Sequence, residues 1–150
     1  MKKVISLFVL MAMLVSIFTV NCFAAESETT VTYFEDGSYI IDTIEISGAR
    51  ASGSISGSKT RSYYDENGNL DWKAVLNGSF SYTGSSATCT SSSVNVTVYD
   101  SSWYTVSKSA SKSGNTANAS VTMGRKVLGV TVEQKSISIS LSCDKNGNLS

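Results

Sequence analysis

Apolar and polar residues alternate along most of the chain after its first 25 residues. In the clearest run, 70–82, one parity is mostly polar and the other holds Trp72, Ala74, Leu76, Gly78, Phe80 and Tyr82. A period of two residues is typical of a β-strand with one face buried. Ser, Thr, Val and Tyr fill most positions between turns, and these residues suit a pleated sheet better than a helix. The pattern therefore predicts an all-β protein.

Turn signals divide this pattern into short segments. They lie at Asp36-Gly37, Asn67-Gly68, Thr83-Gly84-Ser85, Ser113-Gly114-Asn115 and Gly124-Arg125. Such sequences are typical of tight turns between antiparallel strands. We therefore expect about nine strands, near residues 30–34, 39–46, 54–64, 70–82, 86–92, 94–99, 103–111, 116–123 and 127–142. This number of short strands predicts an antiparallel β-sandwich, with a β-barrel as the alternative.

The first 25 residues have the features of a signal peptide. Lys2 and Lys3 precede an apolar run over residues 4–20, and small residues close the segment, as a signal peptidase requires. Removal of residues 1–25 would leave a secreted, extracellular protein without a membrane span. A retained membrane anchor and lipid attachment to Cys22 are the alternatives.

Residues 26–150 are long enough for one hydrophobic core, and we expect a single secreted β-sandwich domain. Within it we distinguish an N-terminal hairpin at 30–46, a Gly/Ser-rich connection at 48–53 and a main body at 54–150. The connection is either a flexible linker or the beginning of a long strand. We favour a strand from Ser54 onward.

The composition excludes several classes of function. Without Lys2 and Lys3 the chain has 12 − 2 = 10 basic residues against 12 acidic ones, so the net charge is about −2. The basic residues are scattered, whereas nucleic-acid binding needs basic patches, and we expect no nucleic-acid partner. The sequence also has no histidine. This excludes Ser-His-Asp and Cys-His catalysis as well as His-ligated zinc.

One motif occurs twice, as DENGNL at 65–70 and as DKNGNL at 144–149. A helix–loop–helix calcium loop needs glycine at its sixth position and a carboxylate at its twelfth. Counted from Asp65, these positions hold Leu70 and Leu76. Asp followed three residues later by Gly is typical of a type I turn. The motif therefore predicts two turns and no metal site, and it leaves the role of the C-terminal turn open.

Cys89 and Cys143 each lie on an apolar parity, so both side chains are expected to face the core. Two cysteines in an exported chain predict a disulfide between them. Such a bond would stabilise the fold by roughly 2–4 kcal/mol. Two buried free thiols are the alternative. Neither cysteine is expected to be catalytic, because the sequence offers no histidine to activate it.

Asp42 is a charged residue on an apolar parity, which it shares with Ile40 and Ile44. We therefore expect its side chain to point toward the apolar face of the sheet. An inward charge near a sheet edge discourages pairing with other edges. The sequence names no partner for this carboxylate.

The segment YDSSWY at 99–104 is the strongest candidate for ligand contact. Tyr99, Trp103 and Tyr104 surround a short turn that contains Asp100. Exposed aromatic rings beside polar groups are what a sugar-binding surface needs. The favoured interpretation is nevertheless that Trp103 and Tyr99 cover the end of the sandwich. Ligand contact by Tyr99, Asp100, Trp103 and Tyr104 is the alternative.

Several stretches together resemble a family of small secreted proteins of Gram-positive bacteria whose domain is uncharacterised. They are YFEDGSYII, YYDENGNLDWKAVLNGSFSYTGSSATCTSSS, DSSWYTVSKSASKSGNTANASVTM and SCDKNGNLS. The resemblance covers nearly all of the chain after the signal peptide. It implies export, and it carries no known catalytic or binding residues.

These observations predict a non-catalytic binding or surface-interaction protein without a cofactor. Its partner class is unknown, and glycan or cell-surface recognition is the leading hypothesis. A self-assembling or protein-interaction role and a bacteriocin-like toxin are the alternatives. A glycosidase would need two carboxylates about 5–10 Å apart, and no pair in the sequence stands out.

Overall fold

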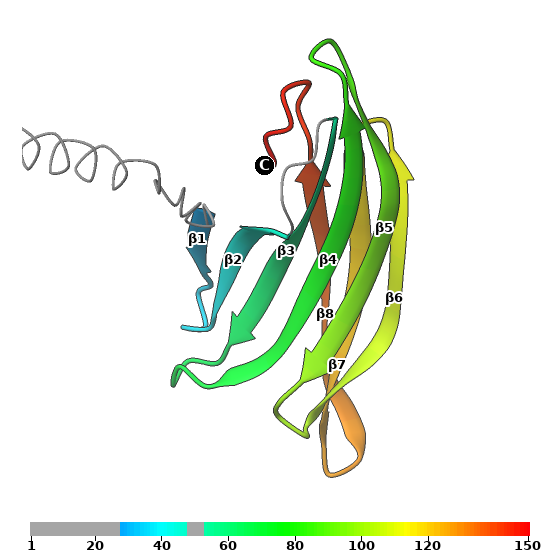
Figure 1. Cartoon of the computed structure of the whole chain (residues 1–150). Helices are drawn as coiled ribbons and strands as arrows, with labels where there is room; N and C mark the ends of the chain where they lie inside the picture. The colour runs from blue at the N-terminus through cyan, green and yellow to red at the C-terminus, as the bar shows by residue number, and fades with distance from the viewer. Residues whose placement is uncertain (1–27, 48–52) are drawn as a thin grey trace, which may run out of the picture.

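The computed structural model describes residues 28–47 and 53–150, and these residues form eight strands and no helix (Figure 1). The predicted signal peptide and residues 48–52 of the predicted connection lie outside the described residues. The strand from Ser54 is confirmed. The strands are β1 (Glu28–Tyr33), β2 (Tyr39–Ile46), β3 (Ser54–Tyr64), β4 (Leu70–Tyr82), β5 (Ala87–Val98), β6 (Trp103–Ser113), β7 (Thr116–Val127) and β8 (Val130–Ser142).

The strands form two antiparallel sheets that pack face to face. One sheet has five strands in the order β1-β2-β3-β4-β5, and the other has three in the order β6-β7-β8. The chain passes from the first sheet to the second through the turn at residues 99–102, so that β5 and β6 lie side by side (Figure 1). The sheets do not close into a barrel, and the predicted β-sandwich is confirmed. Among the described residues, no helix is long and apolar enough to cross a membrane.

One strand fewer is present than expected, because the predicted strands at 86–92 and 94–99 are a single strand, β5. Opposite β4, Phe80 pairs with Cys89 and Ser79 pairs with Ser91. Thr90 is therefore an extra residue that bulges out of the ladder. The bulge moves the inward side chains from odd-numbered to even-numbered positions. In the sequence this change of parity looks like the end of one strand and the start of another.

The predicted turn at Gly124-Arg125 is wrong. β7 continues through both residues, and the chain reverses at Leu128 and Gly129 instead. Both residues have positive φ, 50° for Leu128 and 82° for Gly129. Leucine is unfavourable in this left-handed region, which Asn and Gly enter more easily. Gly129 alone signals a turn at this point, and the leucine before it hides that signal.

The core lies between the sheets and contains most of the residues that alternation marked as inward; Val106, Leu128, Val130 and Val132 also alternate with polar residues but are exposed. From the five-stranded sheet the fully buried large side chains are Trp72, Leu76 and Phe80, and from the other sheet they are Val121, Met123, Ile139 and Leu141. Gly57 and Gly78 pair across β3 and β4. A Cβ atom on Gly78 would lie 2.8 Å from the ring of Phe80, so glycine lets this ring settle against the sheet.

The two copies of the repeated motif form the same turn. In the first copy, Oδ1 of Asp65 accepts hydrogen bonds from the backbone N–H groups of Asn67 and Asn69. Asp144 does the same in the second copy, with Asn146 and Asn148. The predicted turns are therefore confirmed.

The C-terminal copy also closes one end of the sandwich. After the turn, Leu149 forms a bridge with Cys143 and packs against the core. A Cβ atom on Gly57 would lie 2.3 Å from Cδ1 of Leu149, and one on Gly147 would lie 2.7 Å from the ring of Tyr82. The turn at 144–149 therefore packs against the body of the domain. The absence of a side chain at Gly57 leaves room for Leu149, and its absence at Gly147 leaves room for the ring of Tyr82.

Candidate functional site

The residues that the sequence proposed for ligand contact surround the β5–β6 turn, but they do not form one surface. Trp103 points between the sheets and is 4 % exposed, whereas Tyr99 is 52 % exposed. Tyr104, the next residue of β6, points away from the core, where its hydroxyl lies 2.8 Å from that of Thr131. Because Trp103 is buried and Tyr104 points away from the core, the three rings do not form a shared exposed platform.

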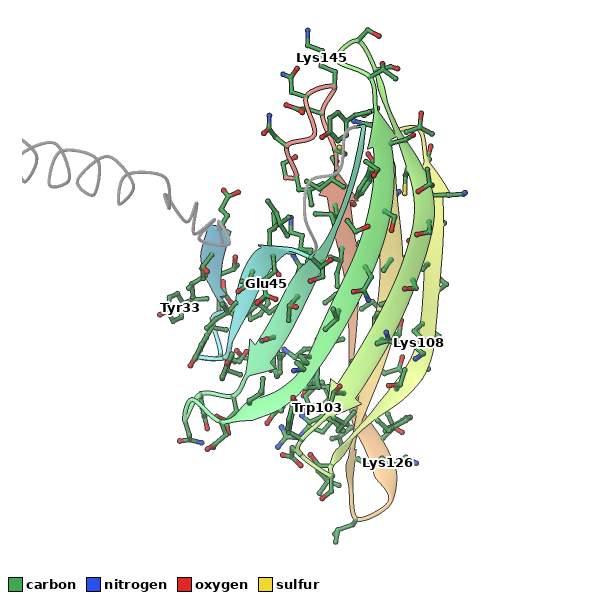
Figure 2. All side chains as sticks on the ribbon, in the orientation of Figure 1. Tyr33, Glu45, Trp103, Lys108, Lys126 and Lys145 are labelled. Carbon is green, nitrogen blue, oxygen red and sulfur yellow. The ribbon has the colours of Figure 1, made fainter. Side chains whose placement is uncertain are left out.

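Trp103 is held by packing and by one hydrogen bond. Its indole N–H donates to Oδ2 of Asp71 over 2.9 Å. Its ring meets those of Tyr63 and Trp72 edge-on, with centroids 5.5 and 6.1 Å away, and those two rings stack on each other at 5.1 Å. A buried ring cannot stack on a sugar. The alternative that Trp103 contacts a ligand is therefore wrong. This side chain packs between the two sheets and joins them (Figure 2).

Asp71 and Asp100 both serve the same turn. Asp71 is a buried carboxylate on β4, and burial raises the pKa of Asp71 above its ordinary value, against the opposing effect of the Trp103 hydrogen bond. Its backbone carbonyl accepts hydrogen bonds from the N–H groups of Tyr99 and Asp100 at 2.8 and 3.0 Å. Oδ1 of Asp100 accepts from the N–H of Ser102 at 2.7 Å. These contacts fix the turn to β4.

An ionic contact that sequence analysis did not identify joins β3 of the five-stranded sheet to β8 of the three-stranded sheet. Arg61 donates two hydrogen bonds to Asp42, from Nε to Oδ1 over 2.7 Å and from Nη2 to Oδ2. Its third nitrogen donates to the backbone carbonyl of Ser138 on β8 over 3.0 Å. Arg61 stands directly opposite Asp42 in the register of β2 and β3. The inward carboxylate therefore has a partner, which the sequence left unnamed.

Lys135 makes a second contact of this kind. From β8 its ammonium group lies 5.1 Å from the ring centroid of Phe34 and 4.8 Å from that of Tyr63. The carboxylate of Glu133 is 3.3 Å away. Burial acts to lower the pKa of Lys135, but Tyr63 and Glu133 outweigh it and hold that pKa above the ordinary value. Lys135 therefore remains charged while it ties β8 to the β1–β2 turn.

Three tyrosines form a ladder on the outer face of the five-stranded sheet. Tyr39 and Tyr64 stack with centroids 4.9 Å apart and planes 5° apart, and Tyr33 follows at 5.4 Å from Tyr39. Tyr33 is 73 % exposed and projects from the edge of the sheet (Figure 2). Sequence analysis missed this ladder because it spans three strands. The available signal was that Tyr39 and Tyr64 have the opposite parity to the buried Ile40 and Tyr63.

The free edge of β1 differs from the other sheet edges. All six of its side chains are exposed, its only charged residue is Glu28, and its register with β2 is regular. On β6 the edge carries Lys108 and Lys112 and a bulge near Val106, and Lys112 also covers the carbonyl of Thr90 on β5. On β8 the edge holds Glu133 and Lys135, and Arg61 occupies the Ser138 carbonyl. Charges and bulges protect an edge from pairing. The edge of β5 has no charged residue, but it is bulged at Thr90 and lies beside β6. Among the described edges, β1 is the one that has neither a bulge nor a basic residue.

The predicted disulfide between Cys89 and Cys143 is not present in the structure, which contains two buried free thiols instead. The thiol of Cys89 donates to the carbonyl of Ser91, and that of Cys143 donates to the carbonyl of Asp144. Burial raises the pKa of both thiols, so little reactive thiolate exists at neutral pH. The parity correctly predicted that both side chains lie in the core. Burial in the same core was not sufficient to bring the two sulfur atoms into a disulfide bond.

Within residues 28–47 and 53–150, no group of three or more His, Cys, Asp and Glu side chains is placed to hold a metal ion. Neither a family model, nor a curated protein, nor a solved structure matches the chain. The resemblance to small secreted proteins of Gram-positive bacteria therefore stays a prediction. The candidate site rests on the exposed edge of β1 and the tyrosine ladder beside it.

Replacement of Asp71 tests its part in holding Trp103. Asp71→Asn keeps an acceptor for the indole N–H but removes the charge, whereas Asp71→Ala leaves the indole without a partner and should cost roughly 1–3 kcal/mol. The folded-state pKa of Asp71 lies above 3.8, so its carboxylate destabilises the fold progressively as pH rises through that pKa. The stability of Asp71→Asn relative to wild type should therefore increase between pH 3 and pH 7 in urea titrations; a constant difference would contradict this.

Thiol labelling tests the state of the cysteines. A thiol reagent should modify Cys89 and Cys143 slowly in the native protein and rapidly in denaturant, because unfolding exposes both groups. Mass spectrometry of peptides would assign the labels and separate them from any label on Cys22. If neither site reacts in denaturant without a reductant, the two cysteines form the disulfide after all.

Proposed function

We propose that this chain is an exported, non-catalytic interaction protein that binds its partner by adding a strand to the edge of β1. The observation that carries the proposal is the contrast between β1 and the other edges. A free edge strand presents a row of unpaired N–H and C=O groups. An extended segment can pair with that row, and its side chains then determine specificity.

The composition of β1 favours such pairing. Its six residues, ETTVTY, include no lysine and no proline, and threonine, valine and tyrosine all suit a strand. Tyr33 also ends the tyrosine ladder with a largely exposed ring, so an added strand can cover it. Aromatic pairs across strands typically contribute about 0.2–1 kcal/mol each. Backbone pairing and ring contact therefore act at the same edge.

A second copy of the chain is the simplest partner. Antiparallel pairing of two β1 strands keeps the faces of both sheets aligned when Val31 lies opposite Val31 and Tyr33 lies opposite Thr29. This arrangement is isologous, so the same residues serve both copies. It would join two five-stranded sheets through their exposed edges, and the side chains of Val31 and Tyr33 would share the outer face with Tyr39.

Glycan recognition loses its main support, because it relied on an exposed ring at Trp103. Tyr33 and Tyr99 are exposed, but Tyr33 lies at the end of β1 and Tyr99 in the β5–β6 turn, at opposite edges of the five-stranded sheet. The rings of Tyr39 and Tyr64 stack on each other, so one face of each ring is covered and cannot contact a sugar. We therefore rank strand addition above glycan binding and above a bacteriocin-like toxin.

A charge on β1 tests the proposal. Val31→Lys places an ammonium group on the unguarded edge, and it should weaken self-association at least about tenfold, or about 1.4 kcal/mol, because each copy would bring a charge to the same interface. Sedimentation velocity over a range of concentrations measures this. The wild-type protein should show concentration-dependent oligomers.

Val106→Lys is the matched control. Val106 is 45 % exposed and Val31 is 43 % exposed, but Val106 lies on the bulged and charged edge of β6. This variant should associate like wild type. A wild-type protein that stays monomeric at high concentration, or a Val31→Lys variant that associates normally, would contradict assembly through β1.

A further inference from the structure

The β7–β8 hairpin ends in four exposed apolar side chains, Val127, Leu128, Val130 and Val132, which we call the hairpin tip. Leu128 is 99 % exposed, and the other three are 50–65 % exposed. The hairpin extends beyond the neighbouring turns at the lower end of the molecule (Figure 1). Contiguous apolar groups of this kind commonly mark an interaction site.

The turn itself does not explain Leu128. With φ values of 50° and 82°, Leu128 and Gly129 form a two-residue connection that Asn-Gly would suit better. A leucine in the left-handed region is strained, and strain of this kind clusters at functional positions. The side chain also gains nothing from packing, because it is almost completely exposed. A large apolar group is therefore held at the end of the hairpin at a cost to the fold.

Cationic and aromatic groups lie directly behind the tip. Arg125 and Lys126 precede it in β7, and Figure 2 places Lys126 beside this hairpin. The ammonium group of Lys126 lies 4.4 Å from the ring centroid of Tyr104, whereas the guanidinium group of Arg125 lies 3.9 Å from the carboxylate of Glu133. The Tyr104 hydroxyl in turn lies 2.8 Å from that of Thr131 in β8. Basic residues and tyrosine are the groups that settle among lipid headgroups, while apolar side chains enter the acyl boundary.

The backbone of the tip suits such a surface as well. Val127 pairs with Val130 and Lys126 with Thr131, so the ladder continues to the two residues of the turn, and Val132 forms a bulge one step behind it. Backbone groups that enter an apolar phase must be satisfied internally. A tight hairpin meets this condition better than an open loop does.

We propose that the hairpin tip inserts into the headgroup and acyl boundary of an anionic lipid bilayer. The positive charge of Lys126 would draw the tip to anionic headgroups, with Arg125 contributing less because Glu133 lies beside it, and the apolar side chains would enter below them. A protruding tip can reach a flat surface without obstruction by the body of the protein. A protein partner would instead need an apolar pocket that matches the tip. This site is separate from the edge of β1 and does not depend on the proposed assembly.

Flotation with lipid vesicles tests this proposal on the purified protein. Vesicles of phosphatidylcholine with phosphatidylglycerol should carry the protein, vesicles of phosphatidylcholine alone should carry less, and added salt should release it because screening weakens the attraction. Leu128→Asn should reduce the bound fraction at least about tenfold, since membrane affinity scales with buried apolar area. Val130→Asp should have the same effect and serves as a second variant.

Leu128→Asn separates binding from folding, because Asn relieves the strained turn. Its melting temperature should equal or exceed that of wild type, so a loss of binding cannot be attributed to unfolding. Val106→Asn removes an exposed valine away from the tip and should bind like wild type. Absence of wild-type binding to anionic vesicles, or equal binding by Leu128→Asn, would overturn the proposal. So would a change of oligomeric state in Leu128→Asn without any vesicle binding, since the tip would then serve a second copy.

Discussion

The packing of Trp103 against Trp72 and Tyr63 is the interaction on which the rest of the structure depends. The two sheets share no continuous ladder of paired strands, so side chains must join them. Trp103 begins β6 and reaches into the five-stranded sheet, where Asp71 accepts its indole N–H over 2.9 Å. Aromatic pairs of this type contribute about 0.5–1.5 kcal/mol beyond the area that they bury. The ring that looked most suitable for a ligand therefore holds the sandwich together.

Where β8 faces the five-stranded sheet, charged side chains join the two sheets instead. Arg61 links Asp42 to the Ser138 carbonyl, and Lys135 reaches from β8 to the rings of Phe34 and Tyr63. Such half-buried charges are costly unless they are paired. They also occupy the edge of β8 that could otherwise accept another strand. The same contacts that close the fold protect the edge of β8, whereas β1, on which the proposed association depends, has no ion pair on its edge.

The sequence was sufficient for the fold class but not for the candidate site. Alternation identified the Trp72 strand because period two follows directly from the pleat. It failed at Thr90, where a bulge shifts the parity, and at Leu128, where a strained residue makes the turn. The tyrosine ladder could not be read from any single segment, since its rings meet only after β1, β2 and β3 pair. The sequence favoured a packing role for both Trp103 and Tyr99, but residue type alone could not show that only Trp103 is buried.

Hydrogen exchange measured by mass spectrometry at low and high protein concentration tests the central claim most directly. The claim is that recognition occurs at the edge of β1 and not at the turn around Trp103. Amides of residues 28–33 should exchange more slowly at high concentration, because pairing protects their free N–H groups, while residues 99–104 should not change. Unchanged exchange in β1, with new protection confined to 99–104, would contradict the account.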